Sequence, residues 1–416
     1  MTDSSPVLGS ALLLATAVLL AGSTLGLLLL RGRRLRGIPA TTAFFAAVVA
    51  GAVFAGAAVP DRGEPQQTAA PQRPGVPSVH KLHLGGQHMT VMVVPNRPGP
   101  NLVAVGGTET VAAGADRDRL TAGTVRAGSA QRWVPVNLPA GESRLWVSAA
   151  GAKTSIEVNT GARADTPAAL RGADGPECAA AAAGALVAGS VRTLTSCPSD
   201  SLAATDRSAL RSVVAFLAGR GTRTAALVSD GSPRGKAAAA VVRAAAADAR
   251  ITLAAPTKGP GTAKAARPLI VVAGWQEAES TLRAVAAGRL RAQGSYLAPW
   301  LLTRPLLLPG AGQLIPLRYA PRTELPMAYV SALSARLPGE YPSGAGYEGW
   351  RRTMGGAATD DAGSVRLYAT AVMYIPGSPL SGPAAGEHRH KGTTTADWLP
   401  NGMIASVAGP FKEEGA

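Results

Sequence analysis

The sequence predicts a multidomain membrane protein with two N-terminal transmembrane helices, a small all-β sandwich and an α/β domain with a mainly parallel sheet. Three observations lead to this fold class. Two apolar runs near the N-terminus flank an arginine cluster, short apolar runs separated by turn signals fill residues 78–160, and strand and helix patterns alternate from residue 176. Hydrophobic residues make up 46% of the 416 residues and charged residues only 16%, as expected if part of the chain lies in lipid.

Residues 1–60 contain the predicted membrane helices. Residues 7–30 form a continuous apolar run, long enough to cross a hydrocarbon core of about 30 Å, and residues 43–59 form a shorter one. The positive-inside rule places the arginines at 31–36 in the cytoplasm, so we expect a multi-pass protein of the cell membrane with an extracellular C-terminal region. Alternatively, residues 31–36 and 43–57 are the n-region and h-region of a signal peptide, which also places the remainder outside.

A Pro- and Gln-rich linker at residues 61–77 follows, and its composition favours an extended spacer. Residues 78–160 then contain short β candidates at 90–94, 102–105, 132–136, 143–147 and 154–158, which predict a β-sandwich. Residues 161–175 are polar and rich in Gly, Ala and Pro, and are expected to form a second linker.

Residues 176–416 are expected to form the α/β domain. The clearest unit is a strand at 224–229, a tight turn, an Ala-rich helix from 236 to 248 and a strand at 251–255. Further strands are expected at 268–273, 295–302, 314–318 and 365–375, and helices at 204–217, 276–287, 328–337 and 346–354. Ligands of such folds bind at the carboxyl ends of the strands. The predicted ligand-binding residues are therefore those of the turn and two aromatic side chains: Ser229, Asp230, Gly231, Ser232, Tyr296 and Tyr341.

The charge pattern and the motifs exclude several functions. The net charge of +15 comes from 41 basic against 26 acidic residues, but the arginines are scattered and lack interleaved aromatics, so nucleic acid is not an expected partner. Residues 231–237 imitate a phosphate loop, yet the spacing is one residue short and Ala237 replaces the hydroxyl that magnesium needs. The sequence contains neither a nucleophile elbow nor a pair of carboxylates suited to catalysis. We therefore expect neither an enzyme nor a cofactor.

The cysteines and histidines leave two questions open. Outside the cytoplasm Cys178 and Cys197 are expected to form a disulfide, with two free buried thiols as the alternative. His80, His83 and His88 lie beside Met89 and Met92, a ligand set that suits copper. In an extended strand, however, His80 and His83 face opposite sides, so a solvated strand edge is the favoured interpretation and no metal site is predicted. His388 and His390 form a second, weaker pair in a polar loop.

Two segments resemble known families. VMVVPNRPGPNLVAV at 91–105 and PAGESRLWV at 139–147 resemble the β domain at the end of CopD-type copper-resistance membrane proteins, a likeness that covers residues 31–160. SDGSPRG at 229–235, GSYLAPWLL at 294–302 and PSGAGYEGW at 342–350 resemble type I periplasmic binding proteins, the receptors of branched-chain amino acid importers, across residues 176–375. In that family a ligand is held between two lobes, and this chain is short of residues for one of them.

The resemblances and the residue patterns together predict a membrane-anchored, extracellular and non-catalytic protein that binds or senses a solute. Its partner would be a small solute or a component of the cell envelope, with a membrane protein as a further partner. The alternatives are a copper-handling accessory membrane protein and a degenerate receptor domain that serves as a protein-interaction module.

Overall fold

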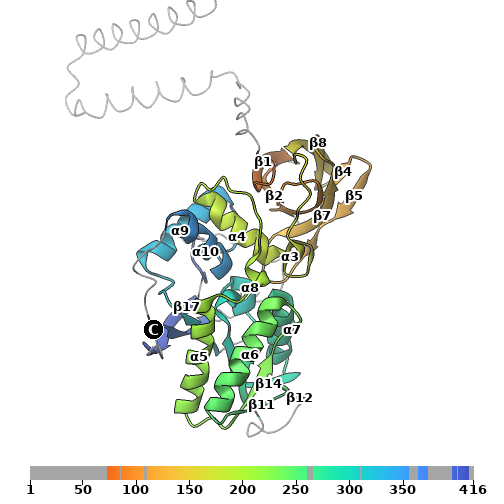
Figure 1. The fold of residues 1–416 in the computed structure, drawn as a ribbon. Helices are drawn as coiled ribbons and strands as arrows, with labels where there is room; N and C mark the ends of the chain where they lie inside the picture. Colours follow the sequence, from red (N-terminus) through yellow and green to blue (C-terminus); the bar gives the residue numbers. More distant parts are fainter. Residues whose placement is uncertain are drawn as a thin grey trace, which may run out of the picture. The chain divides into compact units, whose positions relative to one another are not determined.

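A computed structural model describes residues 73–84, 86–106, 110–259, 266–309, 312–355, 364–372, 396–400 and 402–411. They belong to one compact unit that spans Ala69–Ala416. This unit contains an antiparallel β-sandwich, a mainly parallel sheet with its helices, and a separate group of three helices (Figure 1).

The predicted fold class and the predicted multi-pass location in the cell membrane require correction. Within the described residues, each helix is too short or too polar to cross a membrane, and the chain folds as a mixed α/β structure. The longest of these helices have 16 residues, whereas a membrane span needs about 20. The apolar segments at 7–30 and 43–59, on which that prediction rested, lie outside the described residues.

The β-sandwich consists of two antiparallel sheets. The first has the strand order β1-β2-β3-β7-β6 and the second the order β5-β4-β8-β9. The strands are β1 (Ser78–Leu84), β2 (Gln87–Val94), β3 (Gly99–Val105), β4 (Val111–Asp116), β5 (Arg119–Ala122), β6 (Thr124–Val125), β7 (Arg132–Leu138), β8 (Glu142–Ala149) and β9 (Ala152–Asn159).

The first sheet is buried on both faces. Val91, Val93 and Val103 pack into the sandwich core, while Met92 and Trp133 belong to the core of the α/β part. Burial on both faces explains why β2 and β3 contain continuous apolar runs instead of an alternating pattern.

The larger sheet has eight strands in the described part of the chain, in the order β11-β10-β13-β14-β15-β16-β17, with β12 paired to β14. Pairs from β11 to β15 are parallel, whereas β15–β16, β16–β17 and β12–β14 are antiparallel. The strands are β10 (Thr224–Val228), β11 (Thr252–Ala254), β12 (Thr257–Lys258), β13 (Arg267–Val271), β14 (Leu290–Leu297), β15 (Gln313–Leu317), β16 (Arg366–Val372) and β17 (Gly402–Ala408).

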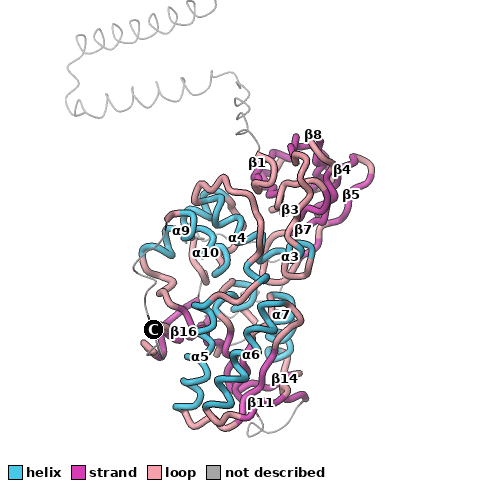
Figure 2. Tube along the Cα trace, viewed as in Figure 1, coloured by secondary structure: helices cyan, strands magenta, loops and turns pink. Residues whose placement is uncertain are grey.

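Helices α5 (Ala204–Gly219) and α6 (Pro233–Asp248) lie side by side next to this sheet, with α7 (Trp275–Ala286) beyond them (Figure 2). The predicted strand, turn, helix and strand at 224–255 are present, and Thr224 pairs with Thr252 in parallel register. The strand predicted at 295–302 instead ends at Leu297, because Pro299 has no N–H to pair and begins a short 3-10 helix (Pro299–Leu301).

Three helices complete the fold: α4 (Gly175–Val187), α9 (Glu324–Arg336) and α10 (Gly344–Thr353). Two short helices, α3 (Ala168–Arg171) and α8 (Arg304–Leu307), and a 3-10 turn (Pro198–Asp200) lie between larger elements. Helix α3 falls within the segment expected to be a linker, and its Leu170 is only 2% exposed. The chain therefore packs tightly where it passes from the sandwich to α4.

Candidate functional site

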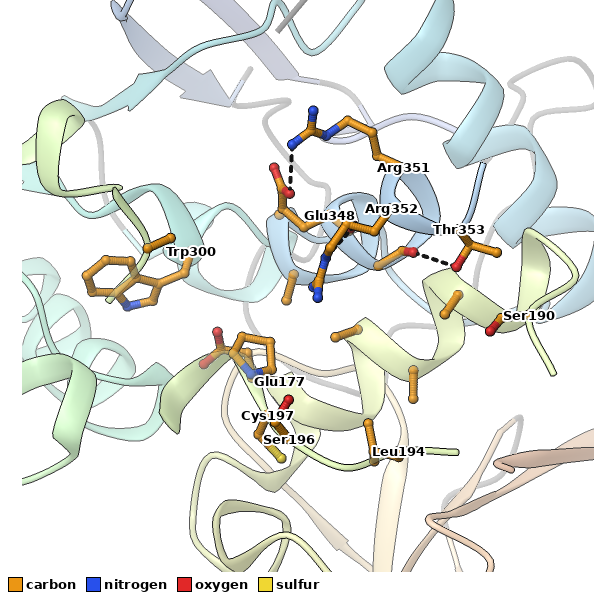
Figure 3. A pocket seen from close by; sticks show the side chains of 18 of the residues that line it. Glu177, Ser190, Leu194, Ser196, Cys197, Trp300, Glu348, Arg351, Arg352 and Thr353 are labelled. Carbon is orange, nitrogen blue, oxygen red and sulfur yellow. Dashed lines mark hydrogen bonds and ion pairs between the residues drawn. The ribbon is translucent and has the colours of Figure 1, made fainter. Parts of the chain in front are cut away.

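A cleft of about 890 Å³ lies among the described residues. Its walls are formed by α4, the segment 189–203 that follows α4, the first turn of α5, residues 316–319 at the end of β15, and α10. Figure 3 shows lining residues of α4, of this segment and of α10. We refer to this cavity as the cleft and to residues 189–203 as the cleft segment. The cleft therefore lies between the three-helix group and the carboxyl-terminal end of the large sheet.

A buried ion pair closes the base of the cleft. Glu177 lies in the first turn of α4 and Arg234 in the first turn of α6, and their side chains are 0% and 3% exposed. Both guanidinium NH₂ groups donate to the carboxylate, each at 2.6 Å, and Arg234 also lies 4.3 Å above the Trp300 ring. Burial raises the pKa of Glu177, and the Arg234 charge opposes that rise. The bidentate geometry favours two ionised partners, so the pair anchors α4 to the α/β sheet.

Asp206 lies in the first turn of α5 and is partly exposed to the cleft. Burial raises the pKa of its carboxyl from 3.8 to about 7. Arg234 and Arg318 act against this rise, whereas Glu348 and Glu177 add to it. Asp206 is therefore a carboxyl whose charge changes near neutral pH inside a cavity, a property typical of functional sites.

The opposite wall is formed by the charged end of α10. Arg351 pairs with Glu348 at 3.2 Å. The Arg352 Nε donates to the Glu348 backbone carbonyl at 3.1 Å, and Figure 3 shows its guanidinium directed into the space between α10 and α4. The helix thus orients a positive charge toward the cavity.

The disulfide predicted from the sequence is confirmed. Cys178 on α4 and Cys197 in the cleft segment are bonded, and the alternative of free thiols is excluded. The Cys197 N–H also donates to the Asp200 carboxylate at 2.7 Å. Both interactions hold the cleft segment beside α4, where its hydroxyls line the cavity: Ser190, Thr193, Thr195, Ser196 and Ser201.

The predicted turn residues are gathered in one place, but they do not line the cleft. The Asp230 carboxylate accepts from the Ser232 N–H at 3.0 Å, the Ser232 hydroxyl at 2.5 Å and the Gly274 N–H at 2.5 Å. Ser232 caps α6 by accepting from the Gly235 N–H at 2.9 Å. The polar groups of Asp230 and Ser232 thus stabilise the turn after β10 and join it to the turn after β13.

The two predicted aromatic residues are also absent from the cleft lining. Tyr296 is 8% exposed, and its ring lies 6.2 Å from Phe216. The Tyr341 ring lies 4.9 Å from the Arg304 guanidinium. Neither residue shares a wall with Asp206 or Arg352.

The histidines of the β1–β2 hairpin separate into two groups. His83 and His88 are direct cross-strand partners, and both are exposed, with ring centroids 4.6 Å apart. His80 instead contacts the Ser78 hydroxyl at 3.0 Å, and burial lowers its pKa to about 4. Across the described residues no group of three or more metal-binding side chains is present, and His388 and His390 lie outside those residues.

Sequence reasoning missed Glu177, Asp206, Arg234 and Arg352. One signal was available for the first of them, because Glu177 is the single charged residue in the sequence of α4. A lone carboxylate in an apolar helix usually has a buried partner. The identity of that partner could not be predicted, since Arg234 is 57 positions away.

Comparisons with known proteins give a limited likeness. No protein-family model matches the chain, and no curated protein matches it. The resemblance of residues 31–160 to CopD-type proteins is therefore unsupported. Among solved structures, the chain is similar over part of its length to ABC transporter substrate-binding proteins and to an extracellular ligand-binding receptor.

Two of these structures are ABC transporter substrate-binding proteins from Desulfitobacterium hafniense, one of them in complex with Leu. They are 13% and 12% identical to this chain, each with a TM-score of 0.28. Each match covers 38% of this chain and about half of the other protein, 49% and 50%. The receptor from Verminephrobacter eiseniae is 15% identical with a TM-score of 0.24, and its match covers 39% of this chain and 63% of that protein.

Proposed function

We propose that this protein binds a small solute in the cleft and does so without catalysis. The observation that supports the proposal is the cavity itself, at about 890 Å³. Sites for small molecules in proteins commonly enclose about 300–1,000 Å³. The Glu177–Arg234 pair closes its base and the disulfide fixes one wall, so the site is preformed.

The chemistry of the lining favours binding over catalysis. Neither histidine nor a free thiol occurs among the described residues that line the cleft. Glu177 is held in its ion pair, so Asp206 is the carboxyl best placed to exchange a proton. An activated nucleophile needs such a base within hydrogen-bond reach, and Asp206 makes no hydrogen bond to a described hydroxyl.

Calorimetric titration and thermal shift with a panel of small polar solutes test this proposal. Thr205→Trp, on the exposed cleft-lining side of α5, should block binding by filling the cavity. The matched control is Ala215→Trp, which is exposed on the same helix but outside the lining. A panel in which no solute binds would contradict the proposal and favour a protein-interaction module.

The turn at 229–232, together with Tyr296 and Tyr341, stays an alternative solute site. The same titration distinguishes the two sites, because Tyr341→Ala removes a predicted contact without touching the cleft lining. Loss of binding in this variant, with Thr205→Trp unaffected, would favour the alternative.

A second candidate function is metal binding at the β1–β2 hairpin, which the facing rings of His83 and His88 favour. Two imidazoles can chelate one divalent transition metal such as Cu²⁺. Copper titration should then show one site that His83→Asn or His88→Asn removes. His80→Asn serves as the control, since His80 is held by Ser78, and equal copper binding in all variants would exclude the site.

A further inference from the structure

The cleft lining carries an excess of positive charge. Five arginines but only three carboxylates contribute to it, so two positive charges remain when every carboxylate is ionised. The basic residues are Arg192, Arg234, Arg318, Arg351 and Arg352, and the acidic residues are Glu177, Asp206 and Glu348. A cavity lined by one predominant sign of charge concentrates ligands of the opposite sign.

The excess lies at identifiable side chains. Arg234 is neutralised by Glu177, and Arg351 pairs with Glu348. Arg318 lowers the pKa of Asp206, so we count these two charges as balancing each other. No carboxylate of the lining then remains to balance the charges of Arg192 and Arg352. Figure 3 shows Arg352 directed into the cavity, where the Glu348 backbone carbonyl orients it.

The two arginines come from different walls. Arg192 belongs to the cleft segment, which the disulfide attaches to α4, and Arg352 lies in the last turn of α10. A ligand group that reaches both side chains would receive donors from two walls of the cleft. Guanidinium groups present paired N–H donors that match the oxygens of carboxylate and phosphate groups.

Neighbouring neutral groups also suit an oxyanion. The hydroxyls of the cleft segment can donate hydrogen bonds to it. The amino-terminal end of α5 lines the cleft as well, and its Ala203 N-cap provides no side-chain hydrogen bond to the first turn. The positive end of that helix dipole therefore adds to the field of the arginines.

We infer that the solute is a small anion, with a carboxylate or phosphate group that binds between Arg192 and Arg352. This inference rests on the proposed solute-binding function and specifies its ligand class. An anion bound there displaces no existing ion pair, because Glu177 and Glu348 keep their own arginines.

The test is a calorimetric titration of the full chain with matched probes that differ in charge. Succinate represents the carboxylates and glucose 6-phosphate the phosphates, while succinamide and glucose are their neutral counterparts and putrescine is a cation. We expect an anionic probe to bind and its neutral counterpart not to bind. The comparison between succinate and glucose 6-phosphate then identifies the acidic group.

Substitutions locate the site. Arg352→Met and Arg192→Met should each weaken binding of the anionic probe at least about tenfold, the effect of losing a charge-assisted hydrogen bond. Both residues are exposed, so both variants should fold. Arg243→Gln, an exposed arginine on α6 outside the cleft, is the matched control and should bind like the parent chain.

Two results would overturn the inference in distinguishable ways. Binding of a neutral or cationic probe, unchanged in Arg352→Met and Arg192→Met, would refute the anion while leaving the solute-binding function intact. Failure of every probe to bind would count against both the anionic ligand and the solute-binding function. Affinity for the anion should also fall as salt concentration rises, since salt screens the arginines.

Discussion

At the scale of single residues, the Glu177–Arg234 pair is the buried ion pair at the base of the cleft. Both side chains are buried, and the Glu177 carboxylate accepts one hydrogen bond from each NH₂ group of Arg234. Removing one partner from such a pair leaves a buried charge uncompensated, which is far more costly than removing both. The pair also joins α4 to α6, two helices that are far apart in the sequence. It therefore links the base of the cleft to the helices that cover the large sheet.

Glu177→Gln should therefore lower the free energy of unfolding by about 3–5 kcal/mol, measured by chemical denaturation. The double variant Glu177→Met with Arg234→Met should recover much of this loss, because no unpaired charge remains. Asp116→Ala is the control, since it breaks the exposed Asp116–Arg119 pair and should leave stability nearly unchanged. Equal effects at the two sites would contradict a structural role for the buried pair.

Asp206 predicts a specific dependence of stability on pH. Its folded-state pKa of about 7 is above the ordinary value of 3.8, so between these values the folded chain binds more protons than the unfolded chain. The contribution of Asp206 to stability is therefore greatest below about pH 4 and is lost as pH rises toward 7. The groups that face it are Arg234, Arg318, Glu348 and Glu177.

Denaturation of the parent chain and of Asp206→Asn between pH 4 and 8 measures this effect. The parent should lose stability relative to the variant as pH rises to about 7, and the difference should then stay constant. The comparison removes the effect of Glu340, whose pKa burial raises to about 8. A difference that does not vary with pH would show that Asp206 titrates normally.

At the scale of elements, the crossing of α4 and α10 depends on three glycines. A Cβ on Gly184 would overlap the Gly346 carbonyl, and a Cβ on Gly349 would overlap the Ala181 carbonyl. The two helix backbones are therefore in direct contact at this crossing. Because α4 and α10 also form two walls of the cleft, their spacing determines its width.

Gly184→Ala should destabilise the chain by about 1–3 kcal/mol, since backbone atoms must move apart to admit the methyl group. Gly219→Ala, at the end of α5, is the control because nothing lies within 4 Å of an added Cβ there. The control should be neutral or slightly stabilising. Thermal denaturation of both variants gives the comparison, and a neutral Gly184→Ala would show that the crossing is more open than the structure indicates.

At the scale of the whole molecule, the β-sandwich and the α/β part share a hydrophobic core. Met92, Leu102 and Trp133 on the outer face of the first sheet belong to the same cluster as Leu170 and the α/β residues. The Thr303 hydroxyl also donates to the Gly128 carbonyl of the sandwich at 3.0 Å. A shared core of this kind couples the unfolding of the two parts.

We therefore expect the β-sandwich and the α/β part to unfold together, in a single calorimetric transition. Trp133→Ala should shift that single transition and cost about 3–5 kcal/mol, because Trp133 is 1% exposed. Trp146→Ala, on the second sheet and only partly buried, is the control and should cost less. Two transitions, of which Trp133→Ala moves only one, would mean that the parts unfold independently.

The local sequence determined the elements whose signals lie within a few residues of one another. Apolar runs and turn residues predicted strands β2, β3, β7, β8 and β9 of the sandwich and the unit at 224–255, because backbone preference and burial act locally. Strands β1, β4, β5 and β6 were not predicted. The two cysteines were expected to pair, and they do. The fold class was wrong in its membrane component, since the described residues form a mixed α/β structure without a membrane-spanning helix.

Only the tertiary structure determined the cleft. Its residues come from segments between Pro77 and Thr353, and no local pattern brings them together. The turn at 229–232 was chosen from its position after a strand, yet Asp230 and Ser232 bond to their own turn and to Gly274. Glu177 contacts Arg234 although 57 positions separate them in the sequence. Arg352 lines the cleft from α10, whose backbone packs directly against α4 at their glycines. Side-chain chemistry can be read from a sequence, but which side chains meet depends on long-range packing.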